Sequence, residues 1–169
     1  MKISKDKLFQ LIIESYMEGG CIISCGNGGS ATQSNHLAEE LVGKYNRDRR
    51  PIKAISLSSD TGIITCIAND YGFENIFSRQ IECMSCKKDI LLCFSTSGSS
   101  PNIVKALEKS NLIGIKAILI TGREYDLEKN NNQFLYYSVD KKESRSVQED
   151  HLVLIHDIIE QIEEKLIKV

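Results

Sequence analysis

The chain has 169 residues, of which 41% are hydrophobic and 26% are charged, and its formal net charge is -2. This length suits one domain with a buried core, and the charge balance excludes the basic surplus that nucleic-acid-binding proteins usually show. Because the sequence has neither an apolar run of about eighteen residues nor a signal peptide, we expect a cytoplasmic protein with no membrane partner and no nucleic-acid partner.

Helical and extended patterns alternate along the chain. We expect helices at residues 5–18, 30–42, 63–68, 74–84, 101–111 and 146–168. We expect strands at residues 21–25, 54–58, 90–95, 116–121 and 134–139. Strands separated by helices predict right-handed crossovers and therefore an α/β fold over residues 1–169. We predict a five-stranded parallel sheet flanked by helices, in a doubly wound, flavodoxin-like or Rossmann-like arrangement.

A glycine loop, residues 26–30 with the sequence GNGGS, joins the first expected strand to a helix. Glycines let the backbone approach a ligand closely, and the helix N-terminus that follows favours an anion. The loop lacks the third glycine of the dinucleotide fingerprint and the G-K-[ST] of a Walker loop. We interpret it as a ligand-binding loop rather than as a simple tight turn.

A hydroxyl loop, residues 95–100 with the sequence STSGSS, joins the third expected strand to a helix that begins with Pro101. Its five hydroxyl side chains converge on one helix N-terminus, where one or two would suffice as caps. Hydroxyls and backbone N–H groups together satisfy the acceptor oxygens of a phosphate. The two loops therefore predict a bound sugar phosphate beyond the carboxyl ends of the strands.

Two expected helices carry all three histidines of the chain. His36 and Glu40 are four residues apart and face the same way, so they form either a metal-binding pair or an ordinary surface pair. Gln148 and His156 are roughly 12 Å apart along the helix axis and differ by about 80° in direction. They reach one ion only if they lean toward each other; otherwise one of them serves another site or another subunit. His151 faces elsewhere and is interpreted as a hydrogen-bonded structural histidine.

Other features of the sequence have plainer readings. We expect six free thiols, with Cys21, Cys25 and Cys93 in the core and a weak metal signal in the C-x-x-C of Cys83 and Cys86. The basic segment 44–50 and the polar segment 128–133 are predicted to be solvated loops.

Six motifs in order resemble the SIS (sugar isomerase) domain family and, within it, the bacterial phosphoheptose isomerases. They are CGNGGS at 25–30, HLAEE at 36–40, NDYGF at 69–73, FSRQ at 77–80, STSGSSP at 95–101 and VQEDHLVLIH at 147–156. The resemblance covers nearly the whole chain. It implies an aldose–ketose isomerase that converts sedoheptulose 7-phosphate to D-glycero-D-manno-heptose 7-phosphate through an enediol, for lipopolysaccharide or capsule heptose biosynthesis.

The resemblance also implies one Zn²⁺ per subunit and a homotetramer with active sites at subunit interfaces. The implied metal ligands are His36, Glu40, Gln148 and His156. Substrate contacts carry over to Asn27, Gly28, Gly29, Ser30, Glu40, Asn69, Asp70, Ser95, Thr96, Ser97, Ser100 and Gln148. The reaction needs a carboxylate base and a proton donor for oxygen, for which Glu40 and His156 are the candidates. A zinc-bound Glu40 is a weakened base, so both roles stay open for it.

The chain departs from the family pattern at its start, at position 44 and in the degenerate stretch that follows residues 121–123. It begins later than the family norm, which predicts a shortened N-terminal helix, and it has Lys44 where the family has Arg, which loses bidentate recognition. One alternative function is a non-catalytic phosphosugar-binding or regulatory SIS protein of the DnaA initiator-associating type. Another is an isomerase of a different phosphosugar. The presence of Glu40 and His156 favours an enzyme over the first alternative.

Overall fold

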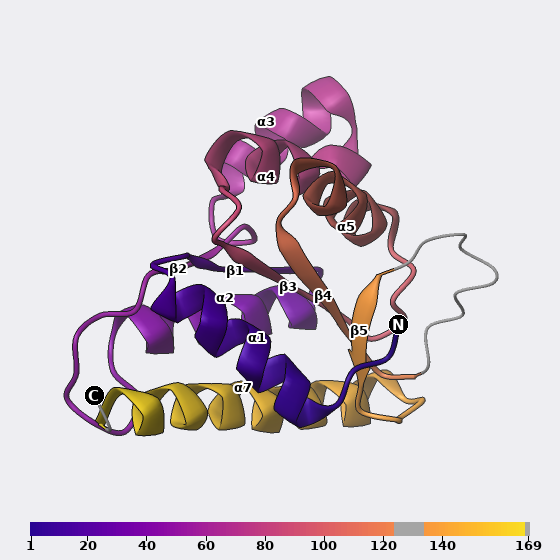
Figure 1. Cartoon of the computed structure of the whole chain (residues 1–169). Coiled ribbons are helices and arrows are strands. Elements are labelled where there is room, and N and C mark those ends of the chain that lie inside the picture. Colours follow the sequence, from indigo (N-terminus) through magenta and orange to yellow (C-terminus); the bar gives the residue numbers. More distant parts are fainter. Residues whose placement is uncertain (124–133, 168–169) are drawn as a thin grey trace.

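The computed structural model describes residues 1–123 and 134–167, and Figure 1 shows the arrangement of its elements. In chain order these are α1 (Lys5–Met17), β1 (Ile22–Gly26), α2 (Gly29–Val42), β2 (Ala54–Ser56), α3 (Thr61–Tyr71), η1 (Phe73–Asn75), α4 (Ser78–Met84), β3 (Ile90–Ser95), α5 (Pro101–Ile113), β4 (Lys116–Thr121), β5 (Leu135–Ser138) and α7 (Ser144–Ile167). The expected surface loop 128–133 and the last residue of the expected closing helix lie outside the described residues.

The helix expected at 74–84 is wrong in its extent. The chain instead forms the 3-10 turn η1 and then the separate helix α4. Ile76 and Phe77 lie between these two elements and are almost fully buried, so the chain turns at this point to place both side chains in the core. The helix expected at 63–68 is longer than predicted, because the Asp60 side chain accepts a hydrogen bond from the Ile63 amide and caps α3.

The sheet has five parallel strands in the order β2-β1-β3-β4-β5, which confirms the doubly wound, flavodoxin-like prediction. Cys25 of β1 pairs in register with Cys93 of β3, and Ser95 of β3 pairs with Thr121 of β4. The carboxyl ends of the central strands therefore lie at one edge of the sheet, where the two loops begin. Among residues 1–123 and 134–167, no helix is both long and apolar enough to cross a membrane.

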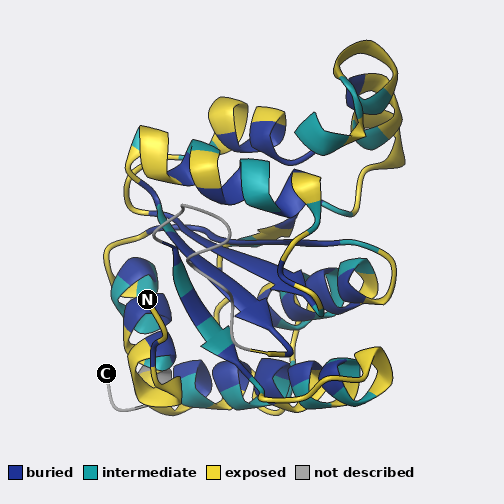
Figure 2. Ribbon diagram, turned by 90° about the vertical axis from the view of Figure 1, so that its right-hand side faces the viewer, coloured by how far each residue is buried: buried dark blue, intermediate teal, exposed yellow. Residues whose placement is uncertain are grey.

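The helices cover both faces of the sheet. Helices α1, α2 and α7 lie on one face, and α3, α4 and α5 lie on the other (Figure 1). Alternate residues of each strand point to opposite faces, so Leu91 and Cys93 join one core cluster while Leu92 and Phe94 join the other. Figure 2 shows that the strands are buried along most of their length, as expected for a parallel sheet.

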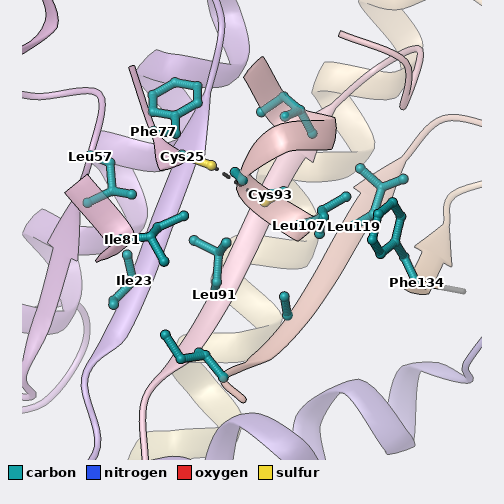
Figure 3. Close-up of a cluster of buried hydrophobic side chains, with 14 of the residues drawn as sticks. Ile23, Cys25, Leu57, Phe77, Ile81, Leu91, Cys93, Leu107, Leu119 and Phe134 are labelled. Carbon is teal, nitrogen blue, oxygen red and sulfur yellow. Dashed lines mark hydrogen bonds between the residues drawn. The ribbon is translucent and has the colours of Figure 1, made fainter. Parts of the chain in front are cut away.

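The predicted core cysteines are confirmed. Cys25 and Cys93 are fully buried, with sulfur atoms 3.5 Å apart, in the cluster that Figure 3 shows. Cys21 is also buried, whereas Cys83 and Cys86 are exposed free thiols.

Candidate active site

The glycine loop and the hydroxyl loop are neighbours because they follow the adjacent strands β1 and β3. The side-chain amides of Asn27 and Asn102 join the two loops through a reciprocal pair of hydrogen bonds. Asn27 Nδ2 donates to Asn102 Oδ1 at 2.9 Å, and Asn102 Nδ2 donates to Asn27 Oδ1 at 2.7 Å. Asn102 is almost fully buried at the start of α5. Sequence reasoning missed it, although its place directly after Pro101 marks the helix start.

The glycine loop brings α2 close to α7. Gly28 has a φ of 54°, and α2 begins at the next residue. A Cβ atom on Gly29 would lie 2.6 Å from the side-chain amide of Gln148, so a larger residue at this position would displace that amide. Gln33 Nε2 also donates to the backbone oxygen of Gln148 at 2.5 Å. Gln148 is therefore fixed against the first turns of α2, and it lines a cavity of about 420 Å³ together with His36.

Two hydroxyls of the hydroxyl loop hold its own turn. Ser95 Oγ accepts a hydrogen bond from the Gly98 amide at 3.1 Å, and Ser97 Oγ accepts one from the Ser99 amide at 3.3 Å. Ser100 precedes α5 without a side-chain capping hydrogen bond. Capping therefore does not account for the run of hydroxyls at this helix N-terminus, where the backbone N–H groups favour an anion.

A second cavity lies where the two loops meet. Its volume is about 700 Å³, and its lining includes Asn27, Gly28, Ser100 and Asn102. Residues that follow α3 complete the wall of this cavity. They are Phe73 and Glu74, neither of which the sequence motifs had marked as site residues. Some of the expected substrate-binding residues of each loop therefore line the same cavity. They are Asn27 and Gly28 of the glycine loop and Ser100 of the hydroxyl loop.

His36, Glu40 and His156 form a cluster that could hold a metal ion, and their ligand atoms all lie within 4.8 Å of one another. Oε2 of Glu40 is 3.2 Å from Nε2 of His36 and 3.9 Å from Nε2 of His156. Two imidazoles and one carboxylate are the ligand set of several catalytic zinc sites, in which neighbouring ligand atoms are about 3.4 Å apart. His36 Nε2 and Glu40 Oε2 are buried and have no hydrogen-bond partner of suitable geometry among the described residues. These orphaned atoms fit a divalent cation.

Tyr45 stacks on His156, with ring centroids 5.3 Å apart and planes inclined by 18°. Its hydroxyl donates to Glu160 at 3.4 Å. Burial, followed by the negative charges of Glu160, Glu40 and Glu163, raises the pKa of Tyr45 above its usual value. Sequence reasoning missed this residue because Tyr45 belongs to a segment without a repeating pattern.

Other predicted residues lie outside the two cavities described above. Asn69 and Asp70 are exposed near the end of α3, where Asn69 Nδ2 donates to Asp70 at 2.7 Å. His151 is buried against the Phe94 ring, as expected for a structural histidine. Neither ring nitrogen of His151 makes a hydrogen bond of good geometry among the described residues, so the expected hydrogen bonds are not formed. Burial lowers the pKa of His151 to about 4. A weaker interaction with the backbone of Thr121 opposes the effect of burial on the pKa of His151.

The basic segment 44–50 is not entirely a solvated loop. The Arg49 side chain is only 6% exposed, because it pairs with the buried carboxylate of Glu163. The prediction is therefore wrong for Arg49, while Lys44 is exposed as expected.

Comparisons with known proteins agree with this arrangement. The sequence profile of the SIS domain family matches residues 4–122. A phosphoheptose isomerase from Helicobacter pylori (strain Shi470) is 41% identical over 153 residues, which are 90% of this chain and 79% of the relative. The solved structures of phosphoheptose isomerases from Neisseria gonorrhoeae and Francisella tularensis match with TM-scores of 0.86 and 0.88 and identities of 31% and 30%. Each match covers 95% of this chain and 85% of the solved chain.

Proposed function

Since this chain belongs to the SIS domain family, we propose that it is a phosphoheptose isomerase that converts sedoheptulose 7-phosphate to D-glycero-D-manno-heptose 7-phosphate. The relatives that carry this name supply the substrate. The observation in the chain itself that carries the proposal is the cluster of His36, Glu40 and His156 beside the glycine loop. A protein that only bound a phosphosugar would need the loops but not this cluster.

The reaction moves a proton between C1 and C2 of the sugar through an enediol. A carboxylate takes the proton from carbon, and a second group delivers or removes a proton at the neighbouring oxygen. We assign the first role to Glu40 and the second to His156. Their side chains approach within 3.9 Å, so both groups face the same part of the site. Tyr45 packs on the imidazole of His156 and limits its rotation.

The metal in this proposal is zinc, for which His36, Glu40, His156 and Gln148 would be the ligands. An atom that holds zinc cannot exchange a proton at the same time, so Glu40 and His156 would alternate between holding the metal and moving the proton. When bound, it supplies a positive charge that polarises the substrate oxygens and stabilises the enediolate. The fit depends on Nε2 of His36 and Oε2 of Glu40, which are buried 3.2 Å apart without a hydrogen bond of suitable geometry among the described residues. Gln148 is included because it lines the same cavity as His36.

The phosphate of the substrate is assigned to the hydroxyl loop and the N-terminus of α5. The hydroxyl of Ser100, which does not cap α5, and the helix N–H groups are donors for phosphate oxygens. The cavity of about 700 Å³ between the loops leaves room for a sugar chain that extends toward α2. The glycine loop then presents the reactive end of the sugar to Glu40, and Asn69 and Asp70 contribute contacts once a neighbouring subunit closes the site.

A homotetramer in the cytoplasm, with active sites between subunits, completes the proposal. Apolar side chains near the site support such an assembly. Leu152 lines the cavity beside Gln148 and is 37% exposed, and Val153 next to it is 60% exposed. We place the product in heptose biosynthesis for lipopolysaccharide or capsule.

The test is direct. The purified protein, supplied with Zn²⁺, is incubated with sedoheptulose 7-phosphate, and NMR spectroscopy follows the anomeric signals of the aldose. We expect these signals to appear and to reach an equilibrium with the ketose. Binding without conversion would instead make the protein a non-catalytic phosphosugar-binding protein. Conversion of another phosphoketose at a much higher rate would assign a different substrate.

A further inference from the structure

Arg49 and Glu163 form a buried ion pair outside the cluster of candidate catalytic residues. Arg49 Nε lies 3.0 Å from Glu163 Oε1, and the two side chains are 6% and 5% exposed. Burial of two opposite charges gives little net stability on its own, because both lose their hydration. Arg49 lies against the backbone of Glu40, and Glu163 lies on the same helix as His156.

The guanidinium group of Arg49 binds the last turn of α2. Its Nη2 donates to the backbone oxygen of Glu40 at 2.6 Å, and its Nη1 donates to the backbone oxygen of Leu41 at 2.8 Å. Helix α2 ends at Val42, so these oxygens belong to the turn that lacks partners within the helix. They also form the negative end of the helix dipole, which a cation stabilises. Arg49 thus holds the backbone of Glu40 itself.

The carboxylate of Glu163 belongs to the helix that carries His156. The two residues are seven positions apart on α7, which is about two helical turns, so they point in similar directions. Arg49 therefore connects the backbone of Glu40 on α2 with the helix of His156. No bond within either helix could fix the distance between these two side chains.

We propose that Arg49 and Glu163 are positioning residues that set the separation between Glu40 and His156. This inference rests on the proposed function for its catalytic consequence. The guanidinium is required because its planar group of donors serves Glu40, Leu41 and Glu163 at once, which the single ammonium of a lysine cannot do. Displacement of a reacting group by about 1 Å costs on the order of a hundredfold in rate.

Loss of the ion pair is expected to lower the rate of the catalytic step and the affinity for zinc, and to leave substrate binding nearly unchanged. The hydroxyl loop follows β3 and does not contact Arg49, so the phosphate anchor is unaffected. We therefore expect kcat and zinc affinity to fall by roughly 10- to 100-fold, as for other residues that orient metal ligands. We expect KM to change by less than about threefold, since KM reports mainly the loops.

The experiment uses the double variant Arg49→Met/Glu163→Met, which leaves no buried charge unpaired. The matched control is Lys116→Met/Glu14→Met, which removes an ion pair at 3.6 Å between β4 and α1. Measurements are kcat, KM and Zn²⁺ affinity by chelator competition. Long-range ¹H–¹⁵N spectra of the three histidines provide a readout that is independent of turnover. His36 and His156 are expected to shift, while buried His151 serves as the internal reference.

A second variant, Arg49→Lys, keeps the charge and covers the case in which the double variant does not fold. It is expected to retain KM and to lose about tenfold in kcat and in zinc affinity. The inference is overturned if folded variants keep kcat, zinc affinity and the His36 and His156 signals of the wild type. Absence of turnover in the wild type would remove the proposed function alone, because the histidine spectra still report the separation of the two helices.

Discussion

Nε2 of His156 lies 3.9 Å from Oε2 of Glu40, although these residues belong to helices far apart in the sequence. The two helices meet at three successive levels. Gly29 of α2 contacts Gln148 of α7, Glu40 faces His156, and the C-terminal turn of α2 is tied to Glu163. Because the three contacts follow in the same order along both helices, α2 and α7 run side by side in the same direction. Their side-by-side packing assembles the candidate site.

Replacement of Glu40 by glutamine is expected to abolish turnover while the affinity for substrate stays within a few-fold. An amide has nearly the shape of a carboxylate but cannot take the proton from carbon. NMR spectroscopy measures turnover, and isothermal titration calorimetry measures binding of sedoheptulose 7-phosphate. The control is Glu39→Gln, which changes the exposed neighbouring glutamate on the same helix. Turnover by the Glu40→Gln variant at the wild-type rate would exclude Glu40 as the base.

Removal of the metal is expected to lower activity strongly, and addition of Zn²⁺ is expected to restore it. The reason is that His36 Nε2 and Glu40 Oε2 are buried 3.2 Å apart and make no hydrogen bond of suitable geometry within the described structure. The measurement is turnover after treatment with a chelator, followed by titration with Zn²⁺, and metal analysis of the protein. Full activity in protein shown to be free of metal would contradict the metal site.

Much of this architecture could be predicted from sequence because its signals are local. Apolar strands, the glycine loop and the hydroxyl loop are each contained in a few consecutive residues. Contacts between distant segments were not predictable in the same way. The hydrogen bond from Arg49 to the backbone oxygen of Glu40 joins an irregular loop to the end of a helix. The stacking of Tyr45 on His156 depends on packing that no periodic pattern in the sequence reveals. The motif resemblance identified Gln148 as a candidate ligand, whereas its position against Gly29 is visible only in the folded structure.

Loss of the Asn102 amide is expected to weaken substrate binding by separating the two loops. Asn102→Ala leaves Asn27 without its partner, and we expect an increase of about tenfold in KM, which corresponds to the roughly 1 kcal/mol of a net hydrogen bond or slightly more. The effect on kcat should be smaller, since Glu40 and His156 lie on other helices. Asn111→Ala, which makes the same substitution at an exposed position of α5 away from the loops, is the matched control. An unchanged KM in Asn102→Ala would show that the loops hold their positions without this pair.

His151 is expected to make the stability of the protein fall at acid pH. Burial lowers its pKa from 6.5 to about 4, so at pH values between these two the unfolded chain binds a proton that the folded chain does not. The stabilising contribution is therefore complete above about pH 6.5 and is lost as the pH falls toward 4. Between pH 7 and pH 4.5 the loss is about 2 kcal/mol. Urea unfolding at both pH values measures it.

The comparison that isolates this effect is the variant His151→Leu, which cannot titrate. Other groups contribute to the pH dependence in both proteins, so the difference between the two losses belongs to His151. We expect the free energy of unfolding of the variant to fall by about 2 kcal/mol less than that of the wild type over the same interval. Equal losses in the two proteins would mean that His151 is protonated without cost in the folded state, which its complete burial beside Phe94 argues against.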